Sequence, residues 1–73
     1  MRPIDDLGSD ARANEIVQKL GFKNGEVFKE EHSCRPSSRF QIKYYTDTKE
    51  LIIVNKGSNI VVEETGLKIP PGF

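Results

Sequence analysis

The spacing of hydrophobic positions changes midway along the chain. Between residues 9 and 21, four apolar side chains recur at i, i+3, i+4 and i+7, which places them on one face of a helix: Ala13, Ile16, Val17 and Leu20. Ser9 or Asp10 is a suitable N-cap, and Gly21 suits the position after a helix end. The pattern therefore predicts an amphipathic helix from about Asp10 to Leu20.

A second, shorter helix is predicted in "KNGEVFKEEH". Asn24 is a plausible N-cap, and Glu26 places a negative charge in the first turn, where the helix dipole favours it. Val27 and Phe28 are expected to point inward. Pro36 and the serines of "SCRPSS" then discourage both helix and strand.

The period becomes two after this loop, as expected of a half-buried strand. One face carries Phe40, Ile42 and Tyr44, and the other carries Arg39, Gln41, Lys43 and Tyr45. After the polar turn "TDTK", the continuous apolar run of "ELIIVN" predicts a strand that is central or buried on both faces. A second turn, "KGSN", precedes the third expected strand, "IVVEE", and two prolines keep the end of the chain extended.

These elements predict a single small α+β domain over residues 1–73. One or two N-terminal helices pack on one face of a small antiparallel β-meander of about three strands. Residues 1–8 are expected to form a linker or an extended N-terminus, and residues 9–70 the globular core.

Composition excludes several classes of function. No apolar run is long enough to span a membrane, and one Cys rules out an internal disulfide. One Cys and one His cannot supply a structural zinc site, so neither a metal nor another cofactor is expected. The chain has no net charge, yet residues 32–49 carry four Lys or Arg against one Asp. That segment would attract an anion, although a solvated loop and strand also explain it.

Three stretches, "GSDARANEIVQKLGF", "SRFQIKYYTDTKELIIV" and "ETGLKIP", resemble the C-terminal toxin domains of bacterial polymorphic toxins of the Rhs/YD-repeat and contact-dependent effector type. The likeness runs from about Gly8 to Pro70. It includes a "YDxxTGE"-like hairpin that reads "YTDTKE" here, with Lys49 in place of Gly. That replacement predicts a turn without a left-handed residue at this position.

The resemblance implies an antibacterial toxin domain, delivered as part of a larger secreted or cell-surface protein and acting in the target-cell cytoplasm. A cognate immunity protein would neutralise it, and many such domains are ribonucleases. We expect RNA and the immunity protein as partners, no membrane contact, and a monomer when the domain is alone.

Metal-independent RNA cleavage needs a base, an acid and cations at the phosphate. His32 is the candidate general acid or base, because imidazole is the side chain that most often has this role. Arg39 and Tyr45 are the other candidate catalytic residues, and Arg35 and Lys43 would bind substrate phosphates. Tyr45 is expected on the solvent face beside Arg39 and Lys43, where it can stack a base or donate a proton. A metal-dependent nuclease is disfavoured because no acidic metal-binding motif lies near the His, and a deaminase lacks its Cys pair.

Each candidate also has a purely structural interpretation. His32 suits the negative end of a helix, Arg39 and Lys43 suit any solvent-facing strand, and Cys34 has no catalytic partner. Tyr44 is expected in the core. The alternative function is a non-catalytic protein-interaction module, which would dock through an acidic N-terminal surface (Asp5, Asp6, Asp10 and Glu15) and through "IVVEE" as an exposed strand.

Overall fold

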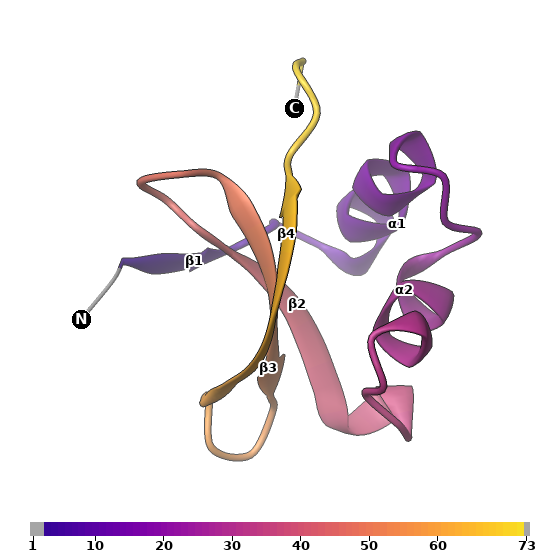
Figure 1. Cartoon of the computed structure of the whole chain (residues 1–73), viewed down its shortest axis with the longest axis vertical. Coiled ribbons are helices and arrows are strands. Elements are labelled where there is room, and N and C mark those ends of the chain that lie inside the picture. Colours follow the sequence, from indigo (N-terminus) through magenta and orange to yellow (C-terminus); the bar gives the residue numbers. More distant parts are fainter. Residues whose placement is uncertain (1–2, 73) are drawn as a thin grey trace.

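In the computed structural model, which describes residues 3–72, two helices pack on one side of a four-stranded sheet (Figure 1). The elements follow in the order β1 (Ile4–Asp6), α1 (Asp10–Lys19), α2 (Gly25–Glu31), a short 3-10 turn (Ser37–Arg39), β2 (Phe40–Tyr45), β3 (Glu50–Asn55) and β4 (Val61–Lys68). The α+β class is confirmed, with four strands in place of about three. No helix among residues 3–72 is long and apolar enough to cross a membrane.

Both helices begin at the caps that the sequence predicts. The Ser9 hydroxyl accepts the Arg12 N–H at 3.2 Å, and the Asn24 side-chain oxygen accepts the Val27 N–H at 2.8 Å. Each bond satisfies a backbone donor that the first turn of a helix leaves without a partner. Gly21 follows α1 with φ of +102°, the left-handed conformation that glycine adopts without strain.

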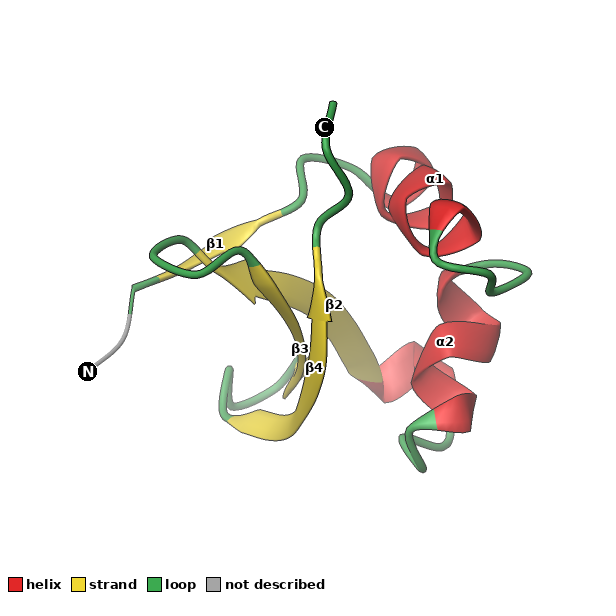
Figure 2. Cartoon of the chain, turned by 45° about the horizontal axis from the view of Figure 1, so that its top comes forward, coloured by secondary structure: helices red, strands yellow, loops and turns green. Residues whose placement is uncertain are grey.

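The strands form a continuous antiparallel sheet in the order β1-β2-β3-β4 (Figure 2). Ile42 pairs with Ile53 and Tyr44 with Leu51, so the predicted hairpin is confirmed and β3 has the central place expected of it. β4 is longer than the expected "IVVEE" and runs through to Lys68. Two shifts of register interrupt its pairing with β3.

The first strand corrects the expectation for residues 1–8. Residues 1–2 lie outside the described residues, but Ile4–Asp6 does not behave as a linker, because it pairs with Lys43–Tyr45 of β2 as an edge strand. Leu7 follows it into the core with 7% of its surface exposed. A three-residue strand with two aspartates has no period-two pattern, so only its pairing with β2 reveals it.

Apolar side chains are buried on both faces of the sheet. The main core lies between the helices and the sheet, where Ile16 and Val17 of α1 and Phe28 of α2 pack with Leu51 and Ile53 of β3. A smaller cluster on the opposite face contains Tyr45, Ile52 and Val54, with Val61 packed against it. β3 is therefore covered on both faces, as its continuous apolar run predicts.

The turn after β2 corrects a second expectation. Lys49 has φ of +66°, so the position is left-handed even though glycine is absent. Hydrogen bonds fix it on both sides: its N–H donates to the Tyr45 carbonyl at 2.7 Å, and its carbonyl accepts the Ile69 N–H at 2.9 Å. Its ammonium group also lies 5.5 Å from the centre of the Tyr44 ring. These contacts hold a conformation that costs a side-chain-bearing residue about 1 kcal/mol.

Candidate functional site

The structure does not bring the five predicted site residues together. His32 is the C-cap of α2, and its Nδ1 lies 2.8 Å from the Phe28 carbonyl, so this nitrogen carries the proton and donates it. Its ring packs against Phe28, with the two ring centres 4.7 Å apart, and lies 6.0 Å from the ring centre of Phe22. This placement matches the structural interpretation of His32 as a helix cap.

The two arginines are exposed and occupy different places. Arg35 lies in the loop that follows α2, close in sequence to His32. Arg39 ends the 3-10 turn, and its carbonyl accepts the Lys56 N–H at 3.0 Å. Arg39 is therefore next to Lys56, a cation that the sequence places far away.

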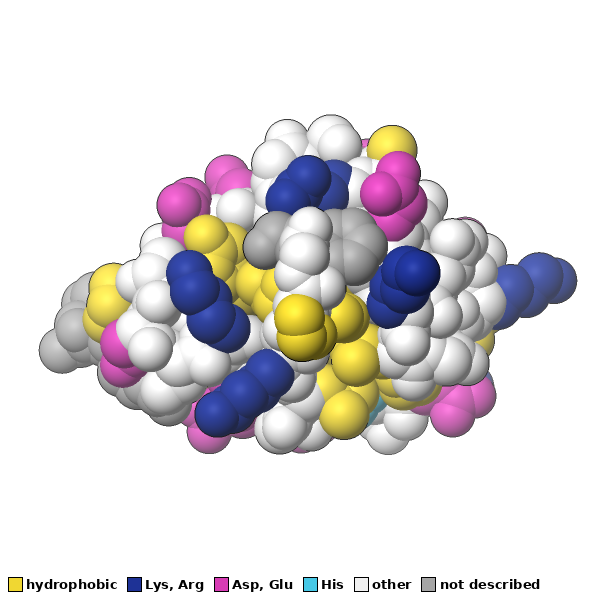
Figure 3. Space-filling model, turned by 90° about the horizontal axis from the view of Figure 1, so that it is seen from above, with side chains coloured by type: hydrophobic (Ala, Val, Ile, Leu, Met, Phe, Trp, Pro, Cys, Tyr) yellow, Lys and Arg dark blue, Asp and Glu magenta, His cyan; other side chains and the backbone are white. Residues whose placement is uncertain are grey.

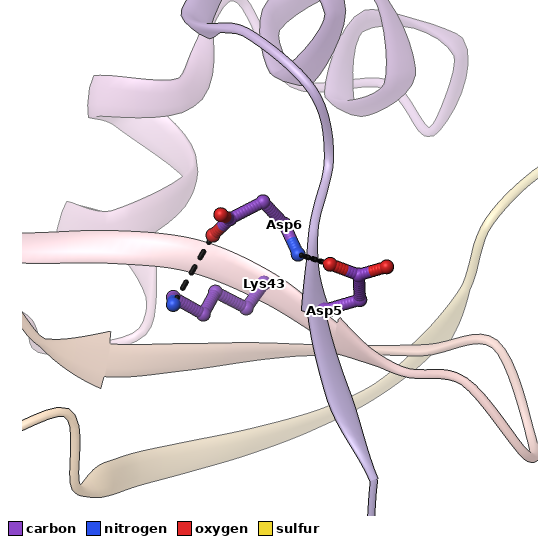
Figure 4. A network of polar contacts seen from close by, with 3 residues as sticks. All are labelled: Asp5, Asp6 and Lys43. Carbon is purple, nitrogen blue, oxygen red and sulfur yellow. Dashed lines mark hydrogen bonds and ion pairs between the residues drawn. The ribbon is translucent and has the colours of Figure 1, made fainter.

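Lys43 is held in an ion pair. Its ammonium nitrogen lies 3.1 Å from a carboxylate oxygen of Asp6, its partner across the β1–β2 ladder (Figure 4). The Asp6 N–H in turn donates to the side chain of Asp5 at 2.8 Å. Lys43 thus balances the acidic edge strand, so a phosphate that bound it would have to compete with Asp6.

Tyr45 corrects the third expectation, since it is buried with 5% of its surface exposed. It does share a sheet face with Lys43, but that face also carries Ile52, the partner of Lys43, and Val54. The phenol donates a hydrogen bond of 2.7 Å to the Glu64 carboxylate of β4. Tyr45 is therefore part of the smaller core cluster and offers no surface on which a base could stack.

Concave space lies elsewhere, in a cleft of about 550 Å³ between the N-terminal ends of both helices and the start of β2. We call it the helix-end cleft. Its charged and polar side chains come from segments far apart in the sequence. They are Asp6, Ser9, Asp10, Asn14, Glu26, Lys29, Gln41 and Lys56.

Two lysines meet in the helix-end cleft. Burial lowers the pKa of Lys29, and the positive charge of Lys56 lowers it further, while Asp10 and Glu26 act in the opposite direction. The Lys29 ammonium group also donates to the Phe40 carbonyl at 3.1 Å, which fixes its position. Lys29 is therefore an amine that gives up its proton more readily than an ordinary lysine.

Two carboxylates complete the charge pattern. Asp10 and Glu26 stand in the first turns of α1 and α2, where the helix dipole stabilises negative charge. Both interact with the charge of Lys29. The helix-end cleft thus combines groups that accept a proton, a group that donates one and a second cation.

Asn14 and Gly25 hold the two helix ends together at this cleft. The Gly25 N–H donates to the Asn14 side-chain oxygen at 2.8 Å, although the two residues belong to different helices. A Cβ at position 25 would meet that oxygen at 3.0 Å and Ile42 Cδ1 at 3.4 Å. Glycine at this position therefore allows α2 to start close to α1 and β2.

A second hollow of about 440 Å³ opens where the chain leaves β4. Leu7, Ile16 and Ile69 contribute apolar surface, with Arg12 and Lys49 at the same hollow. Viewed from this end, Lys and Arg side chains flank a hydrophobic centre (Figure 3). The carboxylate that lines this hollow is that of Asp6, which forms an ion pair with Lys43. The hollow therefore lacks a carboxylate and a lysine with lowered pKa side by side, as the helix-end cleft has them.

One weak signal for the helix-end cleft is present in the sequence: the polar Asn14 directly follows Ala13, which belongs to the apolar stripe of α1. Lys29 and Glu26 look like ordinary charges on a short helix. Their proximity to Lys56 depends on the fold. Within residues 3–72, no group of three or more His, Cys, Asp or Glu is arranged to hold a metal ion.

The chain matches no protein-family model, no curated protein and no solved structure. The resemblance to polymorphic-toxin domains therefore stays a prediction.

Proposed function

We propose that this chain is an antibacterial toxin domain that cleaves RNA without a metal ion, with the helix-end cleft as its site. The observation that carries the proposal is the meeting of Lys29 and Lys56 with Asp10 and Glu26 in one cleft. The sequence resemblance supplies the setting: delivery by a larger secreted or cell-surface protein, action in the target-cell cytoplasm, and neutralisation by a cognate immunity protein.

The proposed reaction is attack of a ribose 2′-hydroxyl on the adjacent phosphate. Glu26 or Asp10 takes the 2′-hydroxyl proton while the bond from the 2′-oxygen to phosphorus forms. The bond from phosphorus to the 5′-oxygen then breaks, and the leaving oxygen takes a proton from Lys29. The products are a 2′,3′-cyclic phosphate and a free 5′-hydroxyl. Lys56 stabilises the charge that grows on the phosphate.

The lowered pKa of Lys29 supports its role as the acid, because a group whose pKa approaches the working pH transfers protons most effectively. The backbone hydrogen bond between Lys56 and Arg39 places the two residues side by side, and Arg39 would bind a neighbouring phosphate. His32 and Arg35 lie beyond the other end of α2, and a seven-residue helix is about 10 Å long. Their predicted roles belong to a site separate from this one.

Induction in a bacterial host without any partner tests the proposal. Wild type should stop growth and degrade total RNA, and Lys29→Gln should reduce cleavage by about 10²- to 10⁴-fold, the usual value of a general acid. Lys19→Gln is the matched control, because Lys19 lies in the last turn of α1, away from the cleft. Full toxicity of Lys29→Gln with loss of toxicity in His32→Ala would move the chemistry to the site predicted from sequence.

A non-catalytic protein-interaction module is the second candidate, and one observation favours it. β4 is an edge strand, and Ile60, directly before it, and Val62, within it, expose 63% and 46% of their surface. Exposed apolar side chains on an open edge suit the addition of a partner strand. Under this alternative, induced wild type leaves both growth and RNA unchanged.

A further inference from the structure

The orientation of Asn14 restricts what it can bind in the helix-end cleft. Its side-chain oxygen faces the Gly25 N–H, because only the oxygen can accept that bond of 2.8 Å. The amide nitrogen therefore points to another side of the group, and within residues 3–72 it has no hydrogen-bond partner. Asn14 is half-buried and lines the cleft. It offers a ligand the N–H₂ as a donor, while its oxygen is engaged by Gly25.

The oxygen cannot readily exchange places with the nitrogen. A flipped amide would set its N–H₂ against the Gly25 N–H, and the first turn of α2 would lose a bond that joins it to α1. The tight approach of Gly25 also keeps the Asn14 side chain in place. Asn14 is thus a fixed donor, in contrast to Gln41, whose amide in the same cleft has no hydrogen-bond partner among the described residues.

We propose that Asn14 reads the base beside the cleaved phosphate and selects bases that carry a carbonyl oxygen there. At one ring position uracil carries a carbonyl oxygen where cytosine carries an amino group. At the corresponding position of the purines, guanine carries a carbonyl oxygen and adenine an amino group. The fixed Asn14 N–H₂ donates to the carbonyl oxygen of uracil or guanine, whereas in cytosine or adenine it faces an amino group that is also a donor. The inference rests on the proposed cleavage site and names its substrate as single-stranded RNA with an accessible uracil or guanine.

The expected preference is large enough to measure. A hydrogen bond to a base edge changes discrimination by about tenfold, and a donor left facing a donor adds to the penalty. Single-stranded RNA is required, because a base in a duplex already uses this edge for pairing.

The test uses the purified chain of residues 1–73 and labelled oligonucleotides that differ only by uracil or cytosine at one position in an adenine background. Wild type should cleave the uracil oligonucleotide about tenfold faster. Asn14→Asp keeps an oxygen for Gly25 and presents an acceptor to the base, so the ratio should reverse in favour of cytosine. Asn24→Asp is the matched control, since aspartate also caps α2 and position 24 is outside the cleft lining.

The ratio of the two rates, rather than either rate alone, decides the result, because an added carboxylate lowers RNA affinity for every sequence. Asn14→Ala provides a second variant should Asn14→Asp fail to fold, and it should bring the ratio close to one. Equal cleavage of both oligonucleotides by wild type, or an unchanged ratio in the folded Asn14 variants, would overturn the inference. Absence of all cleavage would instead overturn the proposed function.

Discussion

Lys49 holds a left-handed backbone conformation in which glycine would be free of strain. Lys49→Gly should therefore raise the free energy of unfolding, by up to about 1 kcal/mol, since relief of strain outweighs the added freedom of the unfolded chain. Thermal or urea denaturation measures the change. Lys49→Ala is the control, because it removes the contact with Tyr44 and keeps the strain. A glycine variant no more stable than the alanine variant would contradict this account of the turn.

The hydrogen bond between Tyr45 and Glu64 gives a second prediction for a single residue. Tyr45→Phe should lower the free energy of unfolding by about 1.5 kcal/mol, because it removes the hydrogen bond from the buried Tyr45 side chain to the charged carboxylate of Glu64. RNA cleavage should be unchanged under conditions where the variant is folded. Tyr44→Phe, in the half-buried neighbour on the other face, should change stability less. Loss of cleavage in folded Tyr45→Phe would restore the catalytic role predicted from sequence.

Sequence reasoning predicted side-chain faces better than side-chain exposure. Tyr45 and Lys43 were correctly placed on one face of the strand, but that face was expected to be exposed to solvent, and Tyr45 is buried. The run "ELIIVN" already indicated that Tyr45 would be buried. A strand that is buried on both faces needs apolar neighbours on both faces, and Ile52 of this strand pairs with Lys43 and packs with Tyr45. The residues of the helix-end cleft were not predictable, because charge along the sequence pointed to residues 32–49 and the fold brings Lys56 to Lys29.

Elements with their own periodicity and caps were predicted to within a residue or two. Both helices and the hairpin of β2 and β3 follow from local pattern, whereas β1 exists through pairing alone. The length of β4 was missed for a different reason: exposure alternates along the whole strand, but residue type does not follow it, since Glu63 is half-buried and Val62 is exposed. Gly66, with φ of +75°, also looks like a turn residue in the sequence.

The apolar face of α1 gives a prediction at this scale. Ile16 exposes 1% of its surface, so Ile16→Asp places an unpaired charge in the core and should cost more than about 3 kcal/mol. A domain of this size has little more stability than that, and we expect the variant to be largely unfolded by circular dichroism. Ala11→Asp introduces the same side chain at an exposed position in the first turn and should melt near wild type. A folded Ile16→Asp variant would show that this face is not buried.

At the scale of the whole molecule, the two perturbed groups predict opposite effects of pH on stability. The pKa of Lys29 is lowered from 10.5, mainly by burial and then by Lys56, so the unfolded chain binds this proton more tightly than the folded one. The free energy of unfolding therefore rises with pH between the pKa of Lys29 in the folded chain and 10.5. Burial, with Glu63, raises the pKa of Cys34 above 9.0, so the stability that Cys34 contributes is present below pH 9.0 and is lost above it.

Urea denaturation over this pH range separates the two contributions. In a Cys34→Ala background the free energy of unfolding should rise with pH, and the further change Lys29→Gln should remove that rise. Equal slopes with and without Lys29 would show that its proton is bound equally in the folded and unfolded chains, and that the cleft does not lower its pKa.

The central claim is that Lys29 and its neighbours in the helix-end cleft cleave RNA. The most direct test is the cleavage rate of a labelled single-stranded RNA by the protein made in a cell-free system, with a chelator present, for wild type, Lys29→Gln and Lys19→Gln. The account predicts products with a 2′,3′-cyclic phosphate, equal rates for wild type and Lys19→Gln, and a rate at least about 100-fold lower for Lys29→Gln. Cleavage by Lys29→Gln at the wild-type rate, or an intact RNA with the folded wild-type chain, would contradict it.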